Sequence, residues 1–173
     1  IITKKGEDLL KIFKDFKPAT KNDEEKKTTI AKNAENKIKR HMKTQNIEKI
    51  LDQIFENKFW EEIAKRCLGC GICTYLCPTC HCFDIQDEKK GKHGARIRVW
   101  DSCMYPEYTK QASGYNPRPS QRNRLRNRMY HKFNYFPKNS QVFGCVGCGR
   151  CITECPVNID IIEIINDAWQ VEK

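Results

Sequence analysis

The chain has 173 residues, of which 31% are charged and 39% hydrophobic, with 11 cysteines and a formal net charge of +10. This length allows one compact domain with an appendage, but not two full-sized domains with separate cores. No segment contains the roughly 20 consecutive apolar residues of a transmembrane helix, so we expect no membrane partner.

The first 45 residues differ in composition from the rest of the chain. Residues 23–45 are rich in Lys, Glu and Asn, and their few apolar side chains are spaced four apart, at Ile30, Ala34, Ile38 and Met42. Such a narrow apolar stripe is typical of an exposed, charged helix. We therefore predict a charged helical extension over residues 1–45 and a compact domain over residues 46–173.

Residues 46–66 should begin the compact domain as one helix, because large apolar residues recur there with the helical period. This helix would lead the chain directly to Cys67. The segment from about residue 77 to residue 144 is interrupted by Pro and Gly and is expected to be irregular. Within it, a short strand over 95–100 and a basic helix over 122–131 are the only regular elements that the pattern favours.

Eight cysteines form two copies of one motif, C-x2-C-x2-C-x3-C-P. The first copy has Cys67, Cys70, Cys73 and Cys77 before Pro78, and the second has Cys145, Cys148, Cys151 and Cys155 before Pro156. This spacing holds [4Fe–4S] clusters in bacterial ferredoxins, where the fourth cysteine of each run ligates the other cluster. We therefore predict two clusters. One would be held by Cys67, Cys70, Cys73 and Cys155, and the other by Cys145, Cys148, Cys151 and Cys77.

Two other uses of the cysteines agree less well with this pattern. Structural zinc sites favour separated C-x2-C pairs over an unbroken run of four cysteines. A disulfide framework would suit a secreted domain, but the cysteine number is odd and the N-terminus becomes charged at Lys4 without a signal-like apolar run. We expect a reducing, cytoplasmic setting.

The second motif leads into an expected helix, with Asp160 and Glu163 arranged as a capping box before an isoleucine-rich stretch. A helix thus enters the first motif and another leaves the second. This arrangement favours a mainly α fold, an α-helical ferredoxin with a long irregular insertion between the two cluster motifs.

Cys80, Cys82 and Cys103 lie outside both motifs. They could form a third iron–sulfur site, with His81, Asp84 or Asp101 as a fourth ligand, or they could be thiols buried beside the clusters. The C-x-C spacing does not decide between these two interpretations, and both stay open.

A basic belt extends from Tyr105 to Lys138, with eight Lys or Arg residues against one acid, Glu107. Arginines interleaved with aromatic residues could bind nucleic acid. We favour another interpretation, in which nearby arginines and backbone dipoles stabilise the anionic clusters and raise their potential, while exposed arginines dock an acidic redox partner.

The ordered segments of the chain resemble a known family. The similar segments are Trp60–Cys67, Cys77–Asp84, Arg98–Cys103, Gly114–Arg118, Arg126–Phe133 and Gly144–Asp160. Together they are similar to the C-terminal part of two related proteins, the A-type subunit of anaerobic sulfite reductase and the sulfhydrogenase beta subunit. The extra cysteines Cys80, Cys82 and Cys103 match the family pattern as well.

This resemblance implies a cytoplasmic electron-transfer subunit in a hetero-oligomer. It would pass electrons between a subunit that is linked to flavin or nicotinamide and a catalytic subunit that reduces sulfite, sulfur or protons. The sequence has no Gly-rich or Walker nucleotide motif, so flavin and nicotinamide should bind elsewhere in the complex. We expect no catalytic residues in this chain. The alternatives are a reductase module with its own catalytic cluster at Cys80, Cys82 and Cys103, and an iron–sulfur protein that binds nucleic acid.

Overall fold

The computed structural model describes residues 3–12 and 17–171, and the chain divides into two units, residues 1–41 and 42–173. The first unit contains helices α1 (Lys4–Leu10) and α2 (Lys21–Asn36). Thr20 caps α2 in a capping box with Asp23. No residue of either helix is buried, and the described part of this unit, residues 3–12 and 17–41, has no hydrophobic core.

The helix predicted over 23–45 is therefore shorter than expected. It ends at Asn36, and Met42 belongs to the second unit, where it packs against the hydrophobic core. The predicted helix was too long because Met42, the last residue of the apolar stripe, packs against the core of the second unit and is not part of the helix.

The second unit begins with two short helices, α3 (Ile47–Gln53) and α4 (Phe59–Ala64), in place of the single helix predicted over 46–66. The break has a local cause. The carbonyl of Ile54 accepts a hydrogen bond from the indole of Trp60 at 2.8 Å, and the side chain of Asn57 accepts one from the backbone of Phe59 at 2.9 Å. These bonds stabilise a turn between the helices, and each helix keeps buried apolar residues.

The segment between the cysteine motifs is only partly irregular, and the mainly α, α-helical ferredoxin architecture expected from the sequence is wrong. After the one-turn helix α5 (Ile72–Tyr75), strands β1 (Phe83–Lys90) and β2 (His93–Trp100) form an antiparallel hairpin with Phe83 opposite Trp100. Gly91, with φ of 62°, allows the two-residue loop between the strands. The strand predicted over 95–100 is confirmed, but its partner was not foreseen because the β1 sequence is mostly charged and exposed.

Helical structure resumes after the hairpin. The elements are η1 (Glu107–Thr109), α6 (Gln121–Tyr130), the π-helical turn η2 (His131–Tyr135), α7 (Phe136–Ser140), α8 (Arg150–Thr153) and α9 (Ile161–Ala168). The helices predicted over 122–131 and after Asp160 are confirmed. Asp160 caps α9 by accepting a hydrogen bond from the backbone of Ile162 at 2.8 Å.

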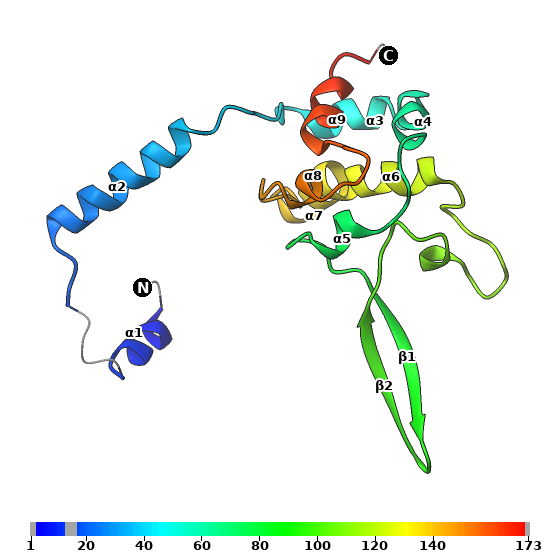
Figure 1. The fold of residues 1–173 in the computed structure, drawn as a ribbon, viewed down its shortest axis with the longest axis horizontal. Coiled ribbons are helices and arrows are strands. Elements are labelled where there is room, and N and C mark those ends of the chain that lie inside the picture. The colour runs from blue at the N-terminus through cyan, green and yellow to red at the C-terminus, as the bar shows by residue number, and fades with distance from the viewer. Residues whose placement is uncertain (1–2, 13–16, 172–173) are drawn as a thin grey trace. The chain divides into compact units, whose positions relative to one another are not determined.

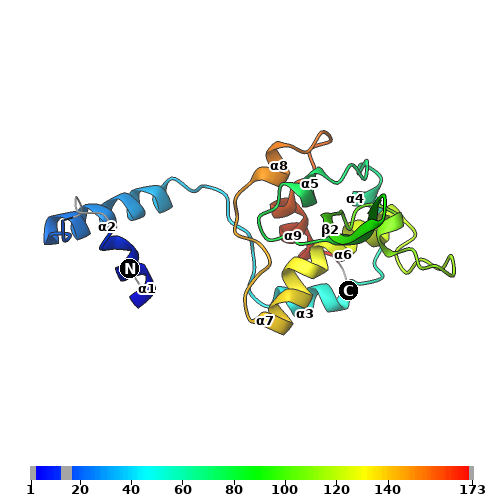
Figure 2. The same ribbon diagram turned by 90° about the horizontal axis from the view of Figure 1, so that it is seen from below.

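The core of the second unit forms where α3, α4, α6 and α9 meet, and α6 packs against α4 (Figure 1). Trp60 and Tyr130 lie at its centre, with ring centroids 5.5 Å apart in an edge-on arrangement. Helices α5 and α8, which belong to the two cysteine motifs, lie side by side in Figure 2. The core therefore holds two motifs together that are far apart in sequence.

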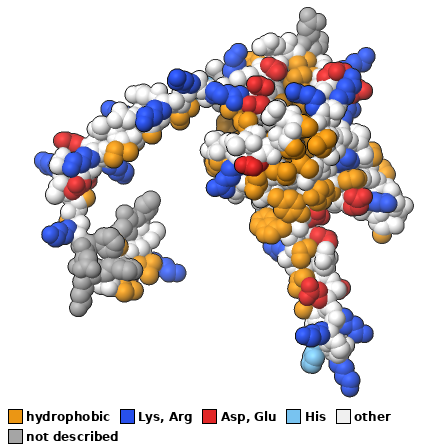
Figure 3. All heavy atoms as spheres, viewed as in Figure 1, with side chains coloured by type: hydrophobic (Ala, Val, Ile, Leu, Met, Phe, Trp, Pro, Cys, Tyr) orange, Lys and Arg blue, Asp and Glu red, His pale blue; other side chains and the backbone are white. Residues whose placement is uncertain are grey.

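The β1–β2 hairpin projects from the body of this unit (Figure 1). Its residues near the body are exposed hydrophobics, Phe83, Ile85 and Trp100, and its tip carries Lys89, Lys90, Lys92 and His93 (Figure 3). Among the described residues, no helix is both long and apolar enough to cross a membrane.

Candidate iron–sulfur sites

The two cysteine motifs adopt the same backbone conformation. Gly71 and Gly149 have φ values of 77° and 75°, and each opens a one-turn helix, α5 or α8, that contains the third cysteine of its motif. A side chain is disfavoured at these left-handed positions. At Gly71 a Cβ would also lie 2.8 Å from the hydroxyl of Tyr105. The repeated sequence thus produces two equivalent loops, each with three cysteines on its inner side.

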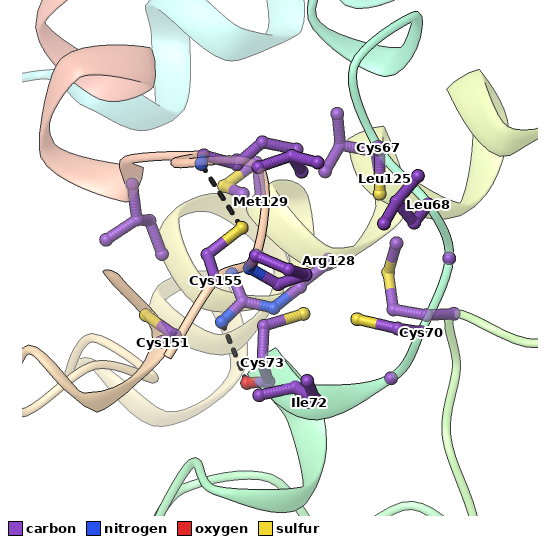
Figure 4. Close-up of a pocket in the computed structure, with 17 residues that line it drawn as sticks. Cys67, Leu68, Cys70, Ile72, Cys73, Leu125, Arg128, Met129, Cys151 and Cys155 are labelled. Atoms are coloured by element: carbon purple, nitrogen blue, oxygen red, sulfur yellow. Dashed lines mark hydrogen bonds between the residues drawn. The ribbon is translucent and has the colours of Figure 1, made fainter. Parts of the chain in front are cut away.

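A cavity in the first loop is lined by the three cysteines Cys67, Cys70 and Cys73 together with Cys155 from the second motif. Figure 4 shows these sulfur atoms around one space, with Cys70 and Cys73 pointing toward each other. Apolar side chains, among them Leu125 and Met129 of α6, close the rest of the wall. The cavity therefore offers four soft sulfur donors in an apolar surrounding, which suits an iron–sulfur cluster.

The second loop encloses a matching cavity. Its lining includes Cys145, Cys148 and Cys151, and the fourth cysteine is Cys77 from the first motif. Cys151 and Arg128 line both cavities, so the two spaces are adjacent. The structure thus brings together the two predicted sets of four cysteines, each with its fourth member from the other motif.

Helix α6 and the π-helical turn η2 place a row of buried cations beside these cysteines. Arg124, Arg128 and Lys132 follow one another at intervals of four residues, which puts them on one helical face. They are only 7%, 3% and 1% exposed. Buried cations normally require a nearby anion. Part of the basic belt therefore lies in the interior of the protein and not on its surface.

Arg128 lies between the two cavities. Its guanidinium donates a hydrogen bond to the backbone carbonyl of Cys73 at 3.0 Å (Figure 4), while its Nε is buried without a hydrogen-bond partner. Burial disfavours the charged form, but the charges of Cys73 and Cys151 outweigh it and raise the pKa of Arg128. An unpaired buried donor next to four thiols is what an anionic cluster would satisfy. The residues present therefore fit [4Fe–4S] clusters.

The buried ammonium of Lys132 contacts the cysteine that closes the second cavity. Its Nζ donates to Sγ of Cys77 at 3.1 Å and to the carbonyl of Gly144 at 2.8 Å. A hydrogen bond from Cys80 is the largest cause that lowers the pKa of Cys77 to about 3, and Thr79 and Lys132 act in the same direction. Cys77 is thus held as a thiolate, the form that binds metal.

Two other cysteine sulfurs accept hydrogen bonds from neighbouring groups. Gln121, at the first position of α6, donates to Sγ of Cys67 at 3.0 Å, and Arg124 in turn donates to the amide oxygen of Gln121 at 2.8 Å. The backbone N–H of Ile159 donates to Sγ of Cys155 at 3.2 Å. Hydrogen bonds to ligand sulfur raise the reduction potential of a cluster.

Sequence reasoning did not single out Gln121, Arg128 or Lys132 as site residues. The signal was present, since Arg124, Arg128 and Lys132 share one face of the helix that was predicted over 122–131. The periodicity of the charges, rather than their number, identifies the residues that face the cysteines.

Each cavity has one exposed corner. Cys70 and Cys148, the second cysteines of the two motifs, are exposed, whereas the other six motif cysteines are partly buried. Leu68 and Val146 stand at equivalent positions beside them and are 67% and 65% exposed. An exposed thiolate with an apolar neighbour is a point where another protein could approach a cluster.

The three remaining cysteines, Cys80, Cys82 and Cys103, line a third and more open pocket of about 450 Å³. A hydrogen bond from Cys103 is the largest cause that lowers the pKa of Cys82 to about 6. His81 and His131 line the same pocket, but Asp84 and Asp101, proposed from the sequence as alternative fourth ligands, do not. Within residues 3–12 and 17–171, no group of three or more His, Cys, Asp or Glu side chains is arranged around one metal ion.

Comparison with known proteins agrees with this geometry. A family model described as a 4Fe-4S dicluster domain matches residues 66–159. The chain is 38% identical over 162 residues to sulfhydrogenase 2 subunit beta of Pyrococcus furiosus, an alignment that covers 93% of this chain and 44% of that protein. The chain thus spans less than half the length of this relative. No solved structure matches the chain.

These matches confirm the resemblance to sulfhydrogenase beta subunits that the sequence segments indicated. The family model begins just before Cys67 and ends after Cys155, so it includes both cysteine motifs and everything between them. Since it covers more than half of the chain, this protein belongs to the 4Fe-4S dicluster domain family of iron–sulfur proteins.

Proposed function

We propose that this chain is an electron relay with two [4Fe–4S] clusters. Cluster A is held by Cys67, Cys70, Cys73 and Cys155. Cluster B is held by Cys145, Cys148, Cys151 and Cys77. The observation that carries the proposal is the pair of adjacent cavities, each lined by three cysteines of one motif and the fourth cysteine of the other.

The crossed arrangement supports a relay because it fixes the distance between the clusters. Arg128 and Cys151 line both cavities, so the two clusters would be neighbours. When bound, the clusters supply one-electron redox chemistry. The residues of this chain hold the clusters, exclude water from their inner sides and balance their charge.

Electrons enter and leave at the exposed corners, Cys70 for cluster A and Cys148 for cluster B. We propose that one corner faces a subunit that is linked to flavin or nicotinamide. The other corner would face a catalytic subunit of a sulfite reductase or hydrogenase type of complex in the cytoplasm. The similarity to a sulfhydrogenase beta subunit supports a hetero-oligomer of this kind. Exposed hydrophobic residues offer a surface for such a partner near the neck of the hairpin, which is the end where Phe83 pairs with Trp100 (Figure 3). They are Tyr75, Leu76, Phe83 and Trp100.

The nucleic-acid alternative loses its main support in the structure. Four cations of the basic belt, Arg124, Arg126, Arg128 and Lys132, are buried, so they cannot contact a phosphate backbone. They contact carbonyls, side-chain amides and cysteine sulfurs of the same chain.

The crossed ligation can be tested with four single cysteine-to-serine variants. Cys70→Ser and Cys148→Ser alter the exposed corners of cluster A and cluster B, and so give a reference spectrum and midpoint potential for damage to each cluster. Cys155→Ser should then resemble Cys70→Ser, and Cys77→Ser should resemble Cys148→Ser, in EPR-monitored redox titrations of anaerobically purified protein. If Cys155→Ser instead resembles Cys148→Ser, and Cys77→Ser resembles Cys70→Ser, the ligand assignment is wrong. Protein that carries zinc, with no acid-labile sulfide, would contradict the relay itself.

A further inference from the structure

We propose that the pocket lined by Cys80, Cys82 and Cys103 binds a third iron–sulfur cluster, in a chain whose family model describes only two. This inference rests on the proposed relay for its electron supply. It does not depend on the ligand assignment of clusters A and B.

The first argument is the way in which the hairpin brings the three thiols together. Cys82 immediately precedes β1, and Cys103 is the third residue after β2. The pairing of Phe83 with Trp100 closes the base of the hairpin between them. The ladder continues past the strands, because the backbone N–H of Asp101 donates to the carbonyl of Cys82 at 3.0 Å. Two cysteines separated by a long hairpin therefore stand across one narrow neck, and Cys80 enters the same pocket two residues earlier.

The second argument is that the neck is anchored to the cluster-binding body, unlike the exposed hairpin beyond it. Ser102 is fully buried, and its hydroxyl forms a hydrogen bond with the hydroxyl of Thr74 in α5 at 2.8 Å. Tyr105 donates to the carbonyl of Cys70 at 3.4 Å. Cys103 is thus fixed against the loop of the first motif. Fixed positions are what ligands of a metal centre require.

The third argument is charge. Arg118, Arg128 and Lys132 line this pocket, and no Asp or Glu of the described chain is part of the lining. The three cations therefore have no carboxylate partner in the lining, and two of them, Arg128 and Lys132, are nearly inaccessible to water. An iron–sulfur cluster with three thiolate ligands is a net anion, so it would neutralise the pocket from inside.

The fourth argument is position. Cys80 is hydrogen-bonded to Cys77, which lines the cavity of cluster B, and Lys132 lines both spaces. A third cluster would therefore neighbour cluster B. One electron would pass from reduced cluster B to the oxidised third cluster, so that the first is oxidised by one electron and the second is reduced by one electron. His81 and His131, whose ring centroids are 5.8 Å apart, stand in the same pocket for the remaining iron corner.

Metal analysis of the full chain tests this inference. Anaerobically reconstituted wild-type protein should contain about twelve iron atoms and as many acid-labile sulfides per chain. The double variant Cys82→Ala/Cys103→Ala should contain about eight of each, and should keep the EPR features and midpoint potentials of clusters A and B. Phe83→Leu, which alters an apolar residue of the same pocket, is the matched control and should keep about twelve.

The third cluster is refuted if wild type and the double variant both contain about eight iron atoms, or both about twelve. Recovery of a Cys82–Cys103 disulfide from wild-type protein that holds about eight iron atoms would assign the pocket to a thiol pair and also refute it. If the double variant fails to fold, stepwise reduction of the wild type decides the question, because a third centre must titrate as a separate EPR component that His131→Ala shifts selectively. Wild type without iron would instead contradict the relay.

Discussion

Lys132 and Cys77 form a buried pair in which the ammonium donates a hydrogen bond to the sulfur at 3.1 Å. The two residues come from different segments, Cys77 from the end of the first motif and Lys132 from the π-helical turn η2. In the proposed relay the Lys132 ammonium therefore contacts a ligand of cluster B, and it contacts no ligand of cluster A.

Replacing Lys132 with methionine should therefore lower the midpoint potential of cluster B more than that of cluster A. The variant removes a charge-assisted hydrogen bond to a ligand sulfur, which stabilised the more negative, reduced form of the cluster. EPR-monitored redox titration measures both potentials. Lys138→Met is the matched control, because it removes the same charge from a partly exposed residue that pairs with Asp52. Equal shifts in these two variants would contradict a specific role of Lys132.

Replacing Arg128 with leucine should lower the midpoint potentials of both clusters. Arg128 lines both cavities, and its buried charge favours the reduced state of each cluster. Arg128→Lys should lower the two potentials less than Arg128→Leu does, because it keeps the positive charge. It should not restore the hydrogen bond to Cys73, since lysine lacks the planar fork of arginine. The same titration provides the readout.

The matched control for Arg128 is Arg126→Leu. Arg126 is also buried on α6, but it faces away from the cysteines: its guanidinium lies 3.6 Å from the centroid of the Phe55 ring and donates to the carbonyl of Phe55. Its loss should destabilise the fold and leave both potentials unchanged. If Arg126→Leu shifts them as much as Arg128→Leu, the effect is one of net charge, not of position.

The conformation of the two cysteine loops could be expected from the spacing, because the motif is a local property of the sequence. Three cysteines and two glycines within seven residues determine each loop, and the structure has two such loops with nearly the same φ values. The cap of α9 at Asp160 was predictable for the same reason, since a capping residue lies next to the helix that it stabilises.

The hairpin and the break between α3 and α4 could not be predicted in this way. Strand β1 has the exposed sequence FDIQDEKK, which lacks the alternation of a half-buried strand, and only its pairing with β2 reveals it. The break depends on the indole of Trp60 reaching back to Ile54, a contact that helical periodicity does not show. The hairpin therefore comes from pairing between two segments, and the break comes from hydrogen bonds that involve side chains; neither follows from local propensity.

The two tryptophans at the start of α4 and the end of β2 should differ strongly in their effect on stability. Trp60 is fully buried and contacts Tyr130 and Phe59, so Trp60→Ala should destabilise the protein by about 3–5 kcal/mol. Trp100 is 70% exposed, and Trp100→Ala should change stability by no more than about 0.5 kcal/mol. Anaerobic urea unfolding followed by far-UV circular dichroism compares them. Similar midpoints would show that the core around Trp60 does not hold the unit together.

Removal of the clusters should unfold the cysteine loops without affecting the first unit. In the proposed crossed arrangement each cluster joins both motifs, so its ligand bonds contribute to folding of the segment from Cys67 to Pro78 and of the segment from Cys145 to Pro156. Hydrogen–deuterium exchange, measured before and after treatment with a chelator and an oxidant, should show faster exchange in both segments together. Helix α2 has no buried residues and belongs to the other unit, so its exchange should stay the same. Loss of protection in one motif alone would mean that each cluster is bound within a single motif, and the crossed ligation would have to be abandoned.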